Sequence, residues 1–356
     1  QLIFPNMALG SLKLLLAATL VVGVSAVQKR AVVCGAGGFI AGHLVKKLQA
    51  EGYWVRGVDI KRHDFFDPSP GDEFIVADLR DRQATEIVID ETIDEVYQLA
   101  ADMGGAGYVN AGLNDSNIVH NSMLINLNVA DVVANRPKVS LVFFSSSACV
   151  YPEHNQLDAQ NVNLLEETAY PAQPDSEYGW EKLMAERVFL MYKRNRNLNV
   201  KIARFHNIFG PMGTWAGGKE KAPAAFMRKI AEIEDGGEIE MWGDGLQTRS
   251  FMLVHECIEG LLKLCRHPTF YGPVNLGSDE MVTMIQLAEI IAEVAGKKIT
   301  IKHIDGPLGV RGRTSENSLI FKELGWRPSR TLKEGVKATY FWIEKQVNLA
   351  KAAQVS

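Results

Sequence analysis

Over the first two hundred residues, segments in which hydrophobic positions have the spacing of a strand alternate with segments in which they have the spacing of a helix. A short apolar run at Arg30–Cys34 predicts a buried strand, and apolar residues at helical spacing predict a helix from Phe39 to about Glu51. A second strand is predicted at Trp54–Val58, ending at Asp59. Strand patterns recur, with helical patterns between most of them, at Glu73–Val76, Glu95–Leu99, Ser140–Phe144 and Val200–Arg204. This alternation predicts an α/β fold built on a doubly wound parallel sheet.

The pattern loosens after Arg204, where irregular segments rich in Gly, Pro and Trp appear at 209–221 and 242–245. A smaller substrate-binding lobe is therefore expected in the second half, with the chain crossing back to the first sheet. Elements predicted there are strands at Val274–Leu276 and Ile299–Ile304 and helices at Thr283–Ala295 and Leu332–Gln346. The expected division is a leader at 1–28, a nucleotide-binding domain at 29–204 with a returning segment at about 242–276, a substrate lobe mainly at 205–346, and a tail at 347–356.

The segment Met7–Ala26 differs in character from the rest of the chain. It holds one Lys, an apolar run from Leu14 and a small-residue ending at Val24-Ser25-Ala26, which resembles a secretory signal peptide. It is short for a membrane span. An appendage to the folded protein, or an apolar helix packed on it, fits the same pattern. For the remainder of the chain we expect a cytoplasmic location.

Composition narrows the classes of function. The 356 residues include 38 basic and 42 acidic side chains, and no Lys/Arg block stands out, which argues against a nucleic-acid partner. The four cysteines show no metal-binding spacing, so we expect reduced thiols and no metal site. They are Cys34, Cys149, Cys257 and Cys265.

A glycine turn, Gly35-x-x-Gly38-x-x-Ala41, joins the first predicted strand to the first helix. Glycine permits the close backbone approach that a pyrophosphate needs, and the helix start supplies N–H groups, as in Rossmann folds. Asp59 follows Gly38 by 21 residues, where a carboxylate can accept hydrogen bonds from a ribose diol and repel a 2′-phosphate. The sequence thus predicts NAD rather than NADP, with Asp78 at the adenine end.

Tyr178 and Lys182 lie four residues apart in a segment with a helical pattern, Glu177–Tyr192. A phenol is a poor base at its ordinary pKa of about 10, and an ammonium one turn away is expected to lower that pKa. Ser147, with Ser146 as the alternative, follows a predicted strand and can present a hydroxyl to the substrate. Together these groups predict hydride transfer with NAD. The predicted cofactor residues are Gly35, Gly38, Phe39, Ile40, Asp59, Asp78, Tyr178 and Lys182.

Several longer segments carry a family resemblance that runs from about Ala31 to Gln346. The narrowest are Ser146-Ser-Ala-Cys-Val-Tyr-Pro152, Glu220-Lys-Ala-Pro-Ala-Ala-Phe226 and Trp242-Gly-Asp-Gly-Leu-Gln-Thr-Arg-Ser-Phe251. With the glycine turn and the Tyr/Lys pair, they resemble the GDP-mannose 3′,5′-epimerases, NAD-dependent isomerases of the extended short-chain dehydrogenase/reductase group. The segment Ala106–His120 departs from the family's usual run.

The resemblance implies a mechanism and its residues. Tyr178 takes the C4 hydroxyl proton of GDP-α-D-mannose during oxidation to a 4-keto sugar. Cys149 and Lys221 then invert C3 and C5, and reduction gives GDP-L-galactose, or GDP-L-gulose after C5 inversion alone, for ascorbate biosynthesis. A thiol and a buried amine can both be tuned toward neutral pH. The implied substrate contacts are Gly104, Ser147, Cys149, Asn207, Glu220, Lys221, Ala222, Lys229, Gln247, Thr248, Arg249 and Arg313, the two arginines suiting a diphosphate.

Other interpretations stay open at this point. A nucleotide-sugar 4-epimerase needs no second acid/base pair, and a 4,6-dehydratase commonly carries an Asp-Glu pair where Ala148-Cys149 stands. A non-catalytic NAD-binding protein would not need Tyr178, Lys182, Cys149 and Lys221 together. The wider superfamily commonly dimerises through two helices per subunit, so a homodimer is expected.

Overall fold

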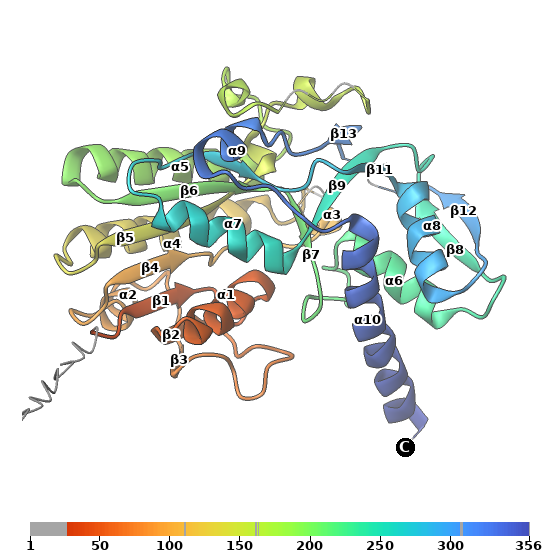
Figure 1. The fold of residues 1–356 in the computed structure, drawn as a ribbon, viewed down its shortest axis with the longest axis horizontal. Coiled ribbons are helices and arrows are strands. Elements are labelled where there is room, and N and C mark those ends of the chain that lie inside the picture. Colours follow the sequence, from red (N-terminus) through yellow and green to blue (C-terminus); the bar gives the residue numbers. More distant parts are fainter. Residues whose placement is uncertain (1–26, 110–111, 161, 163, 307–308, 356) are drawn as a thin grey trace, which may run out of the picture.

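A seven-stranded parallel sheet forms the centre of the molecule in the computed structural model, which describes residues 27–109, 112–160, 162, 164–306 and 309–355 (Figure 1). The leader predicted at 1–28 therefore falls almost wholly outside the described residues. The strand order is β10-β6-β5-β4-β1-β2-β3, and every neighbouring pair is parallel, which confirms the doubly wound α/β prediction. The strands are β1 (Arg30–Cys34), β2 (Trp54–Asp59), β3 (Glu73–Val76), β4 (Glu95–Gln98), β5 (Leu141–Ser147), β6 (Val200–Phe205) and β10 (Val274–Leu276).

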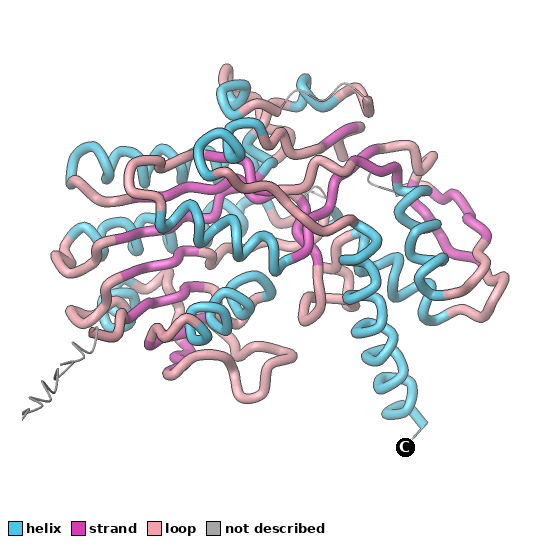
Figure 2. The backbone as a smooth tube through the Cα atoms, in the orientation of Figure 1, coloured by secondary structure: helices cyan, strands magenta, loops and turns pink. Residues whose placement is uncertain are grey.

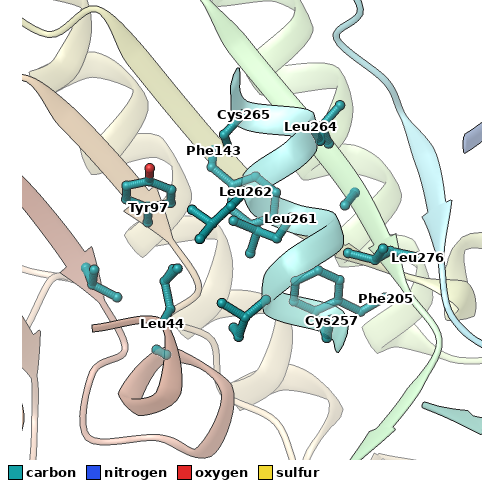
Figure 3. Close-up of a cluster of buried hydrophobic side chains, with 14 of the residues drawn as sticks. Leu44, Tyr97, Phe143, Phe205, Cys257, Leu261, Leu262, Leu264, Cys265 and Leu276 are labelled. Atoms are coloured by element: carbon teal, nitrogen blue, oxygen red, sulfur yellow. The ribbon is translucent and has the colours of Figure 1, made fainter. Parts of the chain in front are cut away.

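Helices cover both faces of this sheet, because alternate strand residues point to opposite sides (Figure 2). On one face, Val33 and Phe143 join a cluster with α1 (Phe39–Ala50), α7 (Val254–Arg266) and α9 (Ser318–Leu324). Figure 3 shows Leu44 of α1 and Leu261 of α7 within this cluster. On the other face, Val32 and Phe144 pack with the second helical layer. That layer consists of α2 (Arg82–Val88), α4 (Asp115–Ala134) and α5 (Glu177–Arg196).

The second half of the chain builds a separate hydrophobic cluster beyond the carboxyl end of the sheet (Figure 1). Its helices α6, α8 and α10 pack on one another around Met227, Leu287 and Tyr340. The helices here are α6 (Ala222–Glu232), α8 (Met284–Ala295) and α10 (Leu332–Val355), and the strands are β7 (Asn207–Phe209), β8 (Glu238–Trp242), β9 (Thr248–Leu253), β11 (Met281–Thr283), β12 (Thr300–Ile304) and β13 (Gly312–Arg313). The short helix α3 (Ala106–Val109) lies between β4 and α4.

Element boundaries differ from the predictions in a few places. Strand β5 continues to Ser147 rather than ending at Phe144, so all three serines are part of the sheet. Helix α10 continues from the predicted end at Gln346 through the expected tail to Val355. Val347, one residue past the predicted end, is buried in the cluster of the second half. In the part of the chain that the structure describes, no helix is both long enough and apolar enough to cross a membrane.

A buried ion pair ties α5 to the sheet. The guanidinium of Arg204 donates to both carboxylate oxygens of Glu186 at 2.9 Å, and the hydroxyl of Ser146 donates to the same carboxylate at 2.5 Å. The side chains of Arg204 and Glu186 are 3% and 2% exposed. The pair therefore fixes α5, which carries Tyr178, against β6, and the bond from Ser146 fixes it against the end of β5.

Removing one partner of this pair should strongly destabilise the fold. We expect Glu186→Ala to lower the free energy of unfolding by about 3–5 kcal/mol, because it leaves the Arg204 charge buried and unpaired. The matched control is Glu86→Ala, which removes an exposed i,i+4 partner of Arg82 and should change stability by less than about 0.5 kcal/mol. Urea unfolding followed by circular dichroism measures both. Equal effects of the two variants would contradict the role given to Glu186.

Candidate active site

A cavity of about 1120 Å³ opens at the carboxyl ends of the parallel strands, between the sheet and the second cluster. This is the edge at which doubly wound folds bind their ligands, and the volume is large for a single small molecule. Its wall includes every predicted cofactor residue and all predicted substrate residues except Thr248. The hydroxyl of Thr248 instead donates to the carbonyl of Ala159 at 2.5 Å, and its side chain is buried behind the wall.

The glycine turn at one end of the cavity has room for backbone and little else. Gly35 has a φ of +86°, and a Cβ there would lie 2.9 Å from the amide nitrogen of Ala100. A Cβ on Gly37 would lie 2.4 Å from the carbonyl oxygen of Lys61. Helix α1 begins directly after Gly38, which provides no side-chain cap for its first N–H groups. Those groups remain available for an anion, as a dinucleotide pyrophosphate requires.

Asp59 ends β2 beside this turn, as predicted. Its carboxylate accepts the N–H of Gly37 at 3.0 Å and that of Lys61 at 3.2 Å, which holds it at the cavity wall. Burial raises the pKa of Asp59, and the backbone N–H groups around it oppose that shift. The ammonium of Lys61 pairs with the carboxylate of Asp64 at 2.5 Å. This cation, which lies close to the ribose position predicted for Asp59, therefore already has an anionic partner. Asp78 pairs with Arg80 at 2.6 Å on the same wall.

Replacing Asp59→Ala should weaken NAD binding and relax the preference over NADP. Hydrogen bonds to a charged group contribute about 1.5–3 kcal/mol, so we expect binding about 10–100-fold weaker. Asp59→Asn keeps the shape and removes the charge, so it should keep more of the NAD affinity while admitting NADP. Chromatography of the cofactor released on denaturation measures this. NADP(H) as the sole cofactor released from the wild type would overturn the assignment.

The predicted hydride-transfer residues lie together where β5 meets α5. The side chain of Ser176 caps α5 by accepting the N–H of Gly179, and this sets Tyr178 in the first turn. Tyr178 is 7% and Lys182 2% exposed. The Lys182 ammonium donates to the carbonyl of Ser145 at 3.2 Å and lies 5.8 Å from the centre of the Tyr178 ring.

The expected effect of Lys182 on Tyr178 is not the dominant one. Burial raises the pKa of Tyr178 well above its ordinary value, Cys149 and Glu181 raise it further, and hydrogen bonding with Ser147 opposes them. Burial also lowers the pKa of Lys182. Desolvation penalises the charged form of both groups and is the largest cause of both pKa shifts. Burial thus favours the neutral phenol, which is the form that donates a proton to an oxyanion, whereas taking the C4 hydroxyl proton requires the phenolate.

Cys149 and Lys221 line the same cavity and belong to different parts of the fold. Cys149 lies in a short 3-10 turn, 148–150, directly after β5, and its N–H donates to the Ser147 hydroxyl at 3.2 Å. Lys221 precedes α6, and burial lowers the pKa of its ammonium. Cys149 interacts electrostatically with both Lys221 and Tyr178. Two groups able to exchange protons thus share one cavity with the Tyr/Lys pair.

The remaining predicted substrate residues line the wall with different partners. Asn207 donates to the carbonyl of Ser250 at 3.0 Å, and Lys229 to that of Glu240 at 2.6 Å. The side-chain oxygen of Gln247 is buried without a partner, so it is open to a ligand donor. Glu220 accepts the N–H of Gly218 at 2.7 Å, and Gly104 and Ala222 complete the wall.

The two arginines do not present the open fork expected for a diphosphate. Arg249 donates to the carbonyls of Thr248 and Val310 at 2.8 and 2.7 Å. Burial lowers its pKa to about 9. Arg313 points its guanidinium at protein groups that include Cys149.

Sequence reasoning missed Asp175 and Gln156. Both hydrogen-bond Arg313, and Asp175 lines the cavity. An acidic residue three positions before Tyr178 was a usable signal for Asp175, whereas nothing in the pattern singles out Gln156.

Comparison with known proteins identifies the family. The sequence model of the NAD-dependent epimerase/dehydratase family matches residues 31–277. The chain belongs to this family. Members use NAD, and the glycine turn and Asp59 fit that cofactor in this structure.

Similar proteins include GDP-mannose 3,5-epimerases from two plants. The Arabidopsis thaliana enzyme is 46% identical over 321 residues, which are 90% of this chain and 83% of the relative. GDP-mannose 3,5-epimerase 1 of Oryza sativa subsp. indica is 44% identical over 91% of this chain and 84% of its own length. Among solved structures, the Thermus thermophilus UDP-glucose 4-epimerase complex with NAD has a TM-score of 0.75 at 23% identity, covering 88% of this chain and 98% of that one.

Proposed function

We propose that this chain is an NAD-dependent isomerase that epimerises GDP-α-D-mannose at C3 and C5 through a 4-keto intermediate. The observation that carries the proposal is that a thiol and an amine, Cys149 and Lys221, line the cavity that also holds Tyr178 and Lys182, where they can serve as a second acid/base pair. Inversion at C4 alone does not require a second pair. The names of the plant relatives support the same substrate.

The roles of the residues follow from chemistry and position. NAD, when bound, supplies the acceptor and later the donor of the C4 hydride. Tyr178 exchanges the proton of the C4 oxygen, with Ser147 hydrogen-bonded to it. The ketone makes the C–H bonds at C3 and C5 acidic, so that Cys149 can remove a proton on one face and Lys221 can deliver one on the other. Burial keeps water away from Tyr178 and Lys182, which limits side reactions.

Incubation with GDP-mannose and product analysis by NMR test the proposal. We expect GDP-L-galactose, accompanied by GDP-L-gulose from inversion at C5 alone. Inversion at C4 alone would yield GDP-talose and would establish the 4-epimerase alternative. No conversion of GDP-mannose or any other GDP-sugar would revive the non-catalytic interpretation.

A homodimer is our proposal for the assembly. Helices α4 and α5 pack side by side, and their outer surface exposes Leu127, Trp180, Met184 and Met191 to 40–52%. The spacing of the last three puts them along one face of α5. We expect sedimentation to give twice the chain mass, and the double substitution Trp180→Asp with Met184→Asp to halve it. A monomeric wild type would contradict the proposal.

We place the reaction in the cytoplasm. The four cysteines are free, and three of them are buried, which fits a reducing compartment.

A further inference from the structure

Arg313 lies on β13, which pairs with β9 so that Arg313 stands beside Arg249. Each nitrogen of its guanidinium has a protein partner. Nε donates to the Gln156 side-chain oxygen at 2.6 Å, one terminal nitrogen donates to the Asp175 carboxylate at 3.2 Å, and the other donates to the Cys149 sulfur at 3.1 Å. The residue is 9% exposed, so these partners account for a largely desolvated charge.

The groups that hold Arg313 are themselves fixed. Gln156 is fully buried, and its side-chain nitrogen donates to the carbonyls of Tyr151 and Pro152, both at 3.2 Å. This orients its oxygen toward Arg313. The side chains of Asp175 and Arg313 are both 11% exposed, and their ion pair fixes the far side of the fork. These two partners fix the orientation of the guanidinium, so that its remaining terminal nitrogen contacts the Cys149 sulfur.

The backbone of Cys149 is also held in place, by close packing against α5. A Cβ on Gly179 would lie 2.2 Å from the carbonyl oxygen of Cys149, so α5 packs directly against this turn. The sulfur is then held between Arg313 and the cavity. The charged and titratable groups that interact with it are Tyr178, Lys182, Lys221, Arg249 and Arg313.

We propose that Arg313, fixed by Gln156 and Asp175, is a positioning residue that aims the Cys149 sulfur at the substrate carbon. The inference rests on the proposed function and deepens it. The Cys149 thiolate takes the proton from C5 or C3, the electron pair of that C–H bond forms the C=C of an enolate, and the ketone oxygen becomes the oxyanion. The Lys221 ammonium then delivers a proton to the opposite face of the same carbon.

Arg313 suits this role because it keeps its own charge. Burial lowers its pKa, but the neighbouring Cys149 and Asp175 act in the opposite direction, and the net shift is upward. A guanidinium beside a cysteine favours the thiolate, which is the reactive form. A lysine at this position would retain a charge but not the fork that contacts three partners at once. This positioning role is separate from the diphosphate contact expected from the sequence, which stays a prediction.

Alkylation of the free, cofactor-loaded enzyme by iodoacetamide tests the inference without substrate. Peptide mass spectrometry isolates Cys149, because Cys34, Cys257 and Cys265 are buried. We expect Arg313→Gln to slow alkylation of Cys149 at pH 7 by about tenfold or more, with recovery toward pH 10 where thiols ionise unaided. Arg313→Lys should fall between this variant and the wild type.

The controls separate the inference from misfolding and from failure of the proposed function. Arg311→Gln removes a neighbouring charge that pairs with Asp244, so it should leave alkylation of Cys149 unchanged. If Arg313→Gln unfolds, the three buried cysteines will also be alkylated. In that case the rate of Cys149 alkylation in Arg313→Lys tests the inference instead. Wild-type alkylation rates from pH 6 to 10 in a folded Arg313 variant would overturn the inference, whatever sugar the enzyme converts. A raised KM for GDP-mannose with unchanged alkylation would likewise assign Arg313 to substrate binding alone.

Discussion

Tyr178→Phe is expected to keep GDP-mannose binding and to lose product formation. The C4 oxygen cannot release its proton as hydride leaves if the phenol is missing. General acid/base assistance of this kind contributes about 10²–10⁴-fold, so the turnover number should fall by at least that factor. Phenylalanine fills the same buried space, so the fold should be retained. Isothermal titration measures binding, and chromatography of the sugar nucleotides measures turnover.

The matched control is Tyr192→Phe on the same helix. The Tyr192 hydroxyl donates to Asp131 at 3.2 Å, away from the cavity, and its loss should leave turnover close to wild type. If Tyr178→Phe also turned over at near wild-type rates, Tyr178 would have no part in proton transfer at C4.

Lys221→Ala is expected to stop inversion while leaving oxidation at C4 possible. The loss should again be about 10²–10⁴-fold in epimerised product, because the opposing proton donor is removed. Lys221→Arg is the informative companion, since it keeps a positive charge but cannot give up its proton near neutral pH. We expect both variants to be inactive in epimerisation. Substantial epimerisation by Lys221→Arg would show that only the charge matters.

Local patterns were enough to predict the cofactor half of the site. The run Arg30–Cys34, the turn at Gly35–Gly38 and the carboxylate at Asp59 are adjacent in a strand–turn–helix–strand unit, so spacing alone relates them. Tyr178 and Lys182 are one helical turn apart, and the structure places both where β5 meets α5. The assignment of Cys149 and Lys221 depended on family resemblance, because neither has a local pattern of its own.

Long-range contacts explain what the sequence did not predict. The bond from Arg313 to Cys149 joins residues 164 positions apart and depends on the pairing of β13 with β9. The upward pKa shift of Tyr178 depends on burial, which spacing does not reveal. By contrast, helix α7 and strand β10, which return to the first sheet, both lie within the returning segment expected at about 242–276.

The most direct test of the central claim is turnover of GDP-mannose in heavy water, with the recovered sugar analysed by NMR and mass spectrometry. If Cys149 and Lys221 exchange protons on a 4-keto sugar, deuterium should enter at C3 and C5. The hydrogen at C4 moves as hydride and does not meet solvent, so C4 should carry none. Cys149→Ser should lose most of the label, because a serine hydroxyl is far less acidic than a thiol. Products without solvent deuterium at C3 or C5 would contradict epimerisation at these carbons and leave only chemistry at C4.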